Sequence, residues 1–161
     1  MIKVPFQRIR AGFLAMFIGL MLCACATQYP DTERVHYYQV DTKKPYEDVL
    51  AELKLAISEH NFRITAHSQV GKIIRQRGAI HFPDYDTIQF CNLSRARTLL
   101  LMAPDAVRHM PCNIVLYSDN HGQVKVSVRL LPVDTANQAL NQFSGQINQS
   151  LREIVDFAVE E

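Results

Sequence analysis

The sequence lacks the features that usually point to nucleic acid or to a membrane span. Its charges balance, with 17 Lys and Arg against 16 Asp and Glu. No block of basic residues occurs, which argues against nucleic acid as a partner. The uncharged apolar run 11–22 has twelve residues, whereas a membrane-spanning helix needs roughly twenty. We therefore do not expect a transmembrane helix.

Sequence motifs with known chemistry are also missing. There is no C-x-x-C-H haem attachment, thioredoxin-like C-x-x-C, G-x-S-x-G elbow, phosphate-binding loop or dinucleotide fingerprint. The chain has no low-complexity tract and no repeat at a fixed period. We expect no cofactor, and we favour a non-enzymatic domain over an enzyme.

The N-terminal segment has the pattern of a bacterial export signal. Three basic residues precede the run 11–22 (AGFLAMFIGLML), whose length suits the apolar part of a signal peptide. The next residues, Leu22-Cys23-Ala24-Cys25, resemble the lipobox, whose last Cys is acylated and becomes the new N-terminus. We predict a lipoprotein signal peptide over residues 1–24 and lipidation at Cys25. A plain secretory signal cut near Ala24 or Ala26 is the alternative.

Lipidation would anchor the mature chain to a membrane. Each buried methylene of an acyl chain such as palmitate adds about 0.8 kcal/mol, so several chains anchor durably. In lipoproteins, Asp after the lipidated Cys commonly causes retention in the inner membrane. Here Ala26 and Thr27 follow, so we expect the periplasmic face of the outer membrane. Removing residues 1–24 takes away three basic residues and leaves 14 Lys and Arg against 16 Asp and Glu.

The remaining chain predicts a short tether and a single domain. Residues 25–33 contain a Pro and no periodicity, which is typical of a tether, and residues 34–161 form the domain. We predict strands over 34–41, 62–66, 87–91, 113–118 and 123–131, and helices over 45–60, 94–103 and 135–159. Ser68 and Ser94 are the expected helix caps. Segment 68–77 fits a short helix, which we favour, or a hairpin turning at Gly71, and 79–86 is predicted as a loop.

Two periodic patterns define the predicted fold class. In 123–131, apolar residues alternate with polar ones, which is typical of a sheet with one buried and one wet face. In 135–159, apolar residues recur at helical spacing, and some 24 residues would span about 36 Å. This length suffices to cross the inner face of a small sheet. We predict an α+β fold, with helices on one face of a curved antiparallel sheet and a long C-terminal helix.

Two short motifs carry a family resemblance. Phe90-Cys91-Asn92 precedes a predicted helix, and Met110-Pro111-Cys112-Asn113 precedes a predicted strand. Over roughly 38–159 the chain resembles the domain of unknown function 302 family, whose members show Cys-Asn-Pro and Leu-Pro-Cys-Asn at these places. Leu93 departs from the family, which usually has Pro there. The resemblance implies an α+β sandwich, and no common activity is established for the family.

Cys91 and Cys112 are the candidate site. In an oxidising compartment they are a candidate disulfide or redox pair, and a bond would be worth roughly 3 kcal/mol in the chain-entropy model. Two reduced, buried thiols are the alternative. His109 and His81 are weak metal candidates, since the paired ligand spacing of zinc sites is missing.

These features favour a lipid-anchored periplasmic binding or accessory domain. Its partner would be a small apolar ligand held between sheet and helix, or an envelope protein. The alternative is a periplasmic redox or metal-handling protein that uses Cys91 and Cys112.

Overall fold

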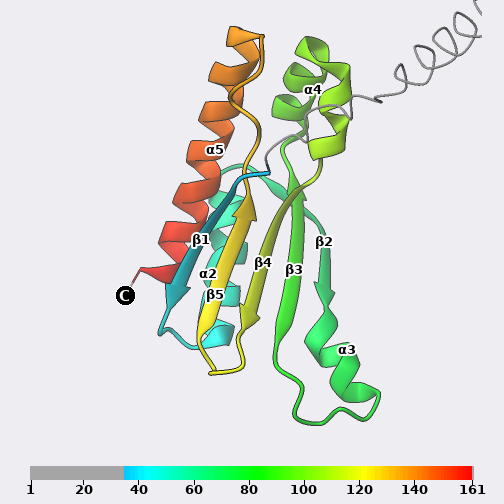
Figure 1. Cartoon of the computed structure of the whole chain (residues 1–161), viewed down its shortest axis with the longest axis vertical. Helices are drawn as coiled ribbons and strands as arrows, with labels where there is room; N and C mark the ends of the chain where they lie inside the picture. Colours follow the sequence, from blue (N-terminus) through cyan, green and yellow to red (C-terminus); the bar gives the residue numbers. More distant parts are fainter. Residues whose placement is uncertain (1–34, 161) are drawn as a thin grey trace, which may run out of the picture. The chain divides into compact units, whose positions relative to one another are not determined.

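The computed structural model describes residues 35–160 (Figure 1). The predicted signal peptide, Cys25 and the tether therefore lie outside the described residues. None of the described helices is both long enough and apolar enough to cross a membrane.

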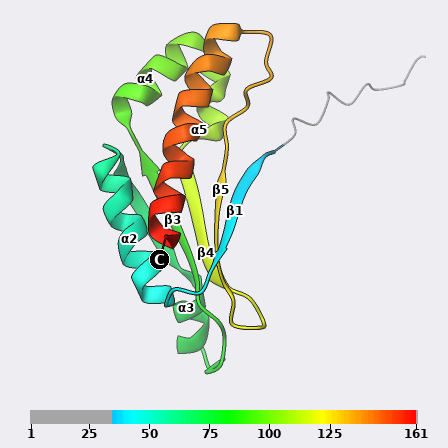
Figure 2. The same cartoon turned by 90° about the vertical axis from the view of Figure 1, so that its left-hand side faces the viewer.

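The described domain is a five-stranded antiparallel sheet with helices on one face (Figures 1 and 2). The strands are β1 (Tyr37–Thr42), β2 (Arg63–Gln69), β3 (Tyr85–Cys91), β4 (Cys112–Ser118) and β5 (Val124–Arg129), in the order β1-β5-β4-β3-β2. The helices are α2 (Tyr46–Glu59), α3 (Val70–Gln76), α4 (Leu93–Met102), the 3₁₀ helix η2 (Pro104–His109) and α5 (Gln138–Val159). The predicted α+β class and the long C-terminal helix are confirmed.

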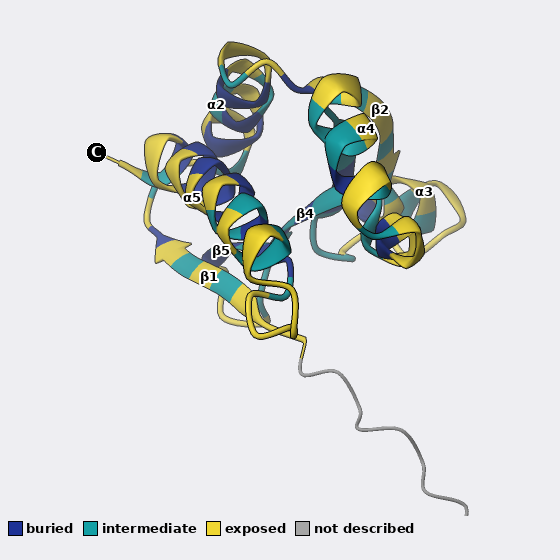
Figure 3. Ribbon diagram, turned by 90° about the horizontal axis from the view of Figure 1, so that it is seen from above, coloured by how far each residue is buried: buried dark blue, intermediate teal, exposed yellow. Residues whose placement is uncertain are grey.

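The core lies between the sheet and the helices α2 and α5 (Figure 3). Alternate residues of β3, β4 and β5 point inward, and the apolar stripes of α2 and α5 cover them. The side chains with no exposed surface include Leu53, Ile57, Ile88, Phe90, Ile114, Leu116, Val126, Val128, Leu151 and Ile154. Burial of these stripes holds both helices against the sheet.

Two predicted helix starts are wrong because asparagine caps act instead. The amide oxygen of Asn92 accepts a hydrogen bond from the Arg95 N–H at 3.0 Å, so α4 begins at Leu93 and Ser94 is not its cap. Asn137 accepts from the Leu140 N–H at 3.1 Å. Consequently α5 begins at Gln138, three residues after the predicted start.

The β2–β3 region holds the other corrections. The register between β2 and β3 shifts between Ile64 and Ala66. Ala66 is therefore exposed instead of following Phe62 and Ile64 inward. The favoured short helix is confirmed as α3, but Ser68 lies in β2 and does not cap it. The predicted loop 79–86 ends too late, since Tyr85 already begins β3.

Two glycines should respond in opposite directions to replacement by Ala. A Cβ on Gly71, in α3, would lie 2.3 Å from the Pro83 carbonyl oxygen and 2.7 Å from the Tyr85 nitrogen. Both are backbone atoms, one just before β3 and one at its first residue, so we expect Gly71→Ala to lower stability by about 1–3 kcal/mol. A Cβ on Gly145, in α5, would meet nothing within 4 Å, so Gly145→Ala should add up to about 1 kcal/mol. Urea unfolding of the two variants checks both signs, and a stabilising Gly71→Ala would contradict the packing.

Candidate functional site

The structure brings Cys91, Cys112 and His109 to one small pocket at the end of the sheet. Cys91 is the last residue of β3, and its neighbour Phe90 pairs with Cys112, the first residue of β4. His109 ends η2, which leads into β4. The pocket has a volume of about 20 Å³. Its lining is mainly apolar and includes Phe62, Leu99, Met110, Leu131 and Ile147, together with Arg95. This volume suits about one water molecule.

Both thiols of the pocket are free in the structure. Burial raises the pKa of Cys91, and burial followed by the nearby Cys91 raises the pKa of Cys112 to about 11. Thiolates are the nucleophilic and metal-binding forms of cysteine. At neutral pH both groups are therefore held as thiols of low reactivity. The disulfide between them stays a prediction.

The reactivity of Cys112 should follow its raised pKa. In a Cys91→Ala chain starting at Ala26, Cys112 is the single cysteine. Iodoacetamide reacts with the thiolate, so the alkylation rate of the native protein should rise about tenfold per pH unit. Burial is the largest cause of the raised pKa and remains when Cys91 is removed, so the rate should level off only well above pH 8.5. The denatured chain should level off near pH 8.5. Mass spectrometry measures both rates, and a native plateau near pH 8.5 would contradict the burial.

The weak metal candidates do not come together. His81 lies in the connection after α3, at the opposite end of the sheet from His109 (Figure 1). Within residues 35–160, no three side chains of His, Cys, Asp or Glu form a group that could hold a metal ion. The described part of the chain thus provides no ligand set for the metal-handling alternative.

A buried carboxylate forms a second polar cluster, which the sequence analysis missed. Asp86 on β3 is 5 % exposed. Its two oxygens contact His67 Nε2 at 2.5 Å and the Tyr46 hydroxyl at 2.6 Å, and that hydroxyl also lies 3.0 Å from the Leu116 carbonyl. Burial, with the hydrogen bond to Asp86, raises the pKa of Tyr46, so the phenol stays a hydrogen-bond donor. The cluster joins the start of α2 to three strands.

The alternation of inward and outward side chains along β3 could have indicated that Asp86 is buried. Asp86, Ile88 and Phe90 occupy every second position, so a strand that starts at Tyr85 places all three side chains on the inner face. The prediction started the strand at Thr87 and left Asp86 in a loop. His67 reaches the same face because of the register shift in β2, which no local sequence pattern marks.

A polar crevice lies at the other end of the sheet from the cysteine pocket. It has a volume of about 490 Å³ and lies between the β1–α2 turn and the β4–β5 turn. Its lining includes Thr42, Lys43, Lys44, Tyr46, His121 and Gln123. In size it matches a small-molecule site, but polar and apolar groups share its walls, which are open to solvent.

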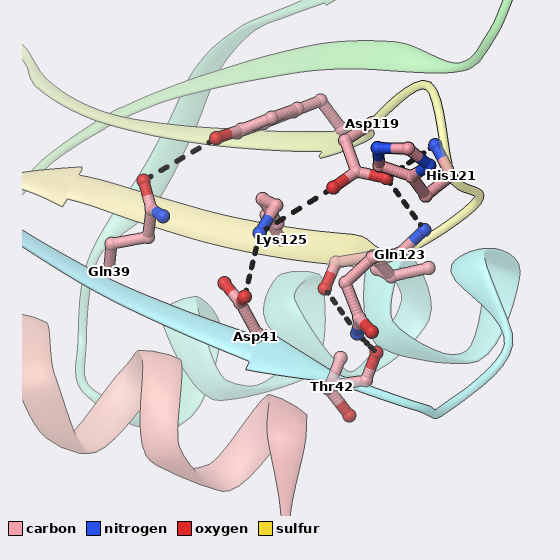
Figure 4. Close-up of polar contacts among 9 residues, drawn as sticks. Gln39, Asp41, Thr42, Asp119, His121, Gln123 and Lys125 are labelled. Atoms are coloured by element: carbon pink, nitrogen blue, oxygen red, sulfur yellow. Dashed lines mark hydrogen bonds and ion pairs between the residues drawn. The ribbon is translucent and has the colours of Figure 1, made fainter.

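Hydrogen bonds hold the walls of the crevice together (Figure 4). The amide of Gln123 donates to the Thr42 carbonyl at 2.6 Å, which ties the β4–β5 turn to the end of β1. On the adjacent outer face, Lys125 Nζ lies 2.6 Å from Asp41 and 3.7 Å from Asp119. The hydrogen bond to Asp41 raises the pKa of Lys125, and the His121 and Gln123 N–H groups lower the pKa of Asp119. These contacts hold the turn in place. They give Asp41, Asp119 and Lys125 a structural role as partners of one another.

The fold is that of a small α+β sandwich domain with Cys91 and Cys112 at one end of its sheet. The family model described as "Domain of unknown function DUF302" matches residues 38–158. The chain belongs to the DUF302 family, as the motifs around Cys91 and Cys112 indicate. A similar solved structure is that of an uncharacterized conserved DUF302 protein from Bacillus stearothermophilus, with 19 % identity and a TM-score of 0.66. The match covers 76 % of this chain and 97 % of that one, and at this identity it shows a shared fold. No curated protein matches the sequence.

Proposed function

We propose that the protein is a lipid-anchored DUF302 domain of the bacterial cell envelope, held at the periplasmic face of the outer membrane by acyl chains on Cys25, where it binds another envelope component. The observation that carries the proposal is the sequence Leu22-Cys23-Ala24-Cys25 directly after an apolar run of twelve residues. Small residues before the acylated Cys fit the processing chemistry, and several acyl chains make such an anchor durable.

The sizes of the two hollows favour a protein partner over a small apolar ligand. The pocket between the sheet and the helices has a volume of about 20 Å³, whereas organic ligands occupy sites of about 300–1,000 Å³. The larger crevice is open to solvent and its lining includes charged and polar side chains such as Lys43 and Gln123, which suit hydrogen-bonding groups better than hydrocarbon. An accessory domain that contacts an envelope protein through its surface is consistent with both.

The redox alternative finds little support in the chemistry of the pocket. A redox-active thiol commonly has a lowered pKa, whereas burial raises the pKa of Cys112 to about 11. The apolar surroundings of the two thiols are those of structural residues that help to fill the end of the core. We therefore do not propose an electron-transfer role for Cys91 and Cys112.

The anchor is tested by metabolic labelling with radioactive palmitate in a Gram-negative bacterium. The native chain should incorporate label and fractionate with the outer membrane. Cys25→Ala should take up none, because it removes the acylated thiol, while the matched control Cys23→Ala should keep the label. A native chain without label would contradict the lipid anchor. Label that persists in Cys25→Ala and disappears in Cys23→Ala would move the anchor to the other cysteine.

A further inference from the structure

The antiparallel order gathers several connections at one end of the sheet. Tyr37, at the start of β1, pairs with Arg129 at the end of β5, and Phe90 near the end of β3 pairs with Cys112 at the start of β4. The β3–β4 connection (92–111) and the β5–α5 connection (130–137) therefore leave from the end at which β1 begins. We call this end, with both connections, the tether end. Figures 1 and 2 show α4 and the first turns of α5 extending beyond the strands there.

Exposed apolar side chains concentrate at the tether end. Of the twelve large apolar side chains exposed among residues 35–160, seven lie there, namely Val35, Tyr37, Leu93, Leu101, Met102, Val107 and Val133. The six residues Leu99–Pro104 (LLLMAP) are all apolar, and only Leu99 among them is buried. Leu101 is 72 % exposed and Val107, on the adjoining η2, is 58 % exposed. A run of exposed apolar residues at a projecting tip commonly marks an interaction site.

The segment between Cys25 and Val35 is short, and this favours a lipid bilayer as the surface that the tip meets. Nine residues separate Cys25 from Val35, and a fully extended chain of that length spans about 35 Å. The tether end is where the domain receives this segment, so an acyl anchor at Cys25 keeps that end close to the bilayer. The opposite end of the sheet is one strand length from the attachment point, about 20 Å for six residues.

We infer that the tip formed by the end of α4 and by η2, with Leu101, Met102 and Val107 at its surface, inserts into the interfacial layer of the lipid bilayer. This inference rests on the proposed lipid anchor. Apolar side chains of interfacial helices bury about 5–10 Å into the boundary of headgroups and acyl chains. The acyl chains hold the protein at the membrane, and the tip fixes which end of the domain faces it. The polar crevice at the opposite end then faces the periplasm.

Single tryptophans test this orientation cleanly, because the chain contains no Trp. Leu101→Trp places a fluorophore at the tip, and Val107→Trp repeats the test on η2. Ile80→Trp is the matched control, since Ile80 is 75 % exposed and follows α3 at the opposite end. All three substitutions are at exposed positions, where a change is usually tolerated. Each palmitate-labelled variant is reconstituted into vesicles of phosphatidylglycerol and phosphatidylcholine brominated on its acyl chains.

Bromine quenches tryptophan on contact, so the emission reports which end touches lipid. Trp at 101 and at 107 should lose most of their emission and shift to shorter wavelength, while Trp at 80 should emit as it does in unbrominated vesicles. Acylated protein that is quenched at neither tip position, or equally at all three, would overturn the membrane contact alone. A blue shift at 101 that grows with protein concentration and ignores bromine would assign the tip to a second copy instead. A chain without palmitate would overturn the anchor and the contact together.

Discussion

Replacing Phe90 by Ala should lower the free energy of unfolding by about 3–5 kcal/mol. Phe90 has no exposed surface and belongs to the hydrophobic core. Its ring meets the Phe62 ring edge to face, with 5.3 Å between the centroids and 86° between the planes. Removing it forfeits this contact and leaves a cavity that the rigid sheet cannot close. Because small domains have about 5–15 kcal/mol of stability in total, the loss would be a large part of it.

Urea unfolding of the chain from Ala26 onward measures this loss. Leu93→Ala is the matched control, because Leu93 is 78 % exposed and also lies at the β3–α4 junction. Its stability should change by no more than about 0.5 kcal/mol. Equal losses in the two variants would mean that the β3–α4 region does not pack as described.

Replacing Asn148 by Leu should cost about 2–6 kcal/mol, although the side chains have similar volumes. Asn148 on α5 is 8 % exposed. Its amide oxygen accepts from the Leu131 N–H at 2.8 Å, and its nitrogen donates to the Leu131 carbonyl at 2.9 Å. Leu131 follows β5 and has no strand partner there. Leucine would leave both backbone groups buried and unsatisfied, at about 1–3 kcal/mol each.

Asn141→Leu provides the comparison on the same helix. Asn141 also hydrogen-bonds a backbone segment, at Thr135, but these bonds are exposed, and water replaces them when the side chain is lost. We expect at most about 1.5 kcal/mol from this variant by the same urea measurement. A loss as large as that of Asn148→Leu would show that burial does not set the cost.

Much of the fold followed from periodicity, because burial on one face imposes it. The alternating valines of β5 and the helical stripe of α5 marked the elements that enclose the core. The errors came from features without a period. Asn92 and Ser94 are both good caps. Because β3 ends at Cys91, Asn92 follows the strand directly and caps α4. The 3₁₀ helix η2 is too short for a pattern, and its residues were left unassigned.

The candidate site was also predicted only in part: the cysteine pair was found from the sequence, and the Asp86 cluster was not. Cys91 and Cys112 were named as a candidate pair from the sequence, and the structure places both at one end of the sheet. The Asp86 cluster depends on where β3 begins and on the register shift of β2, so local sequence did not reveal it. Asn148 lies outside the apolar stripe of 135–159, so periodicity gave no sign that it is buried. It is buried because the backbone of Leu131, after β5, packs against it and forms two hydrogen bonds with its amide.

The mass of the N-terminal peptide of mature protein, purified from bacterial membranes, tests the central claim most directly. The account predicts a peptide that begins at Cys25 and carries the added mass of acyl chains on that residue. A mature chain that begins at Ala26 or further on without lipid, or one that retains residues 1–24, would contradict it.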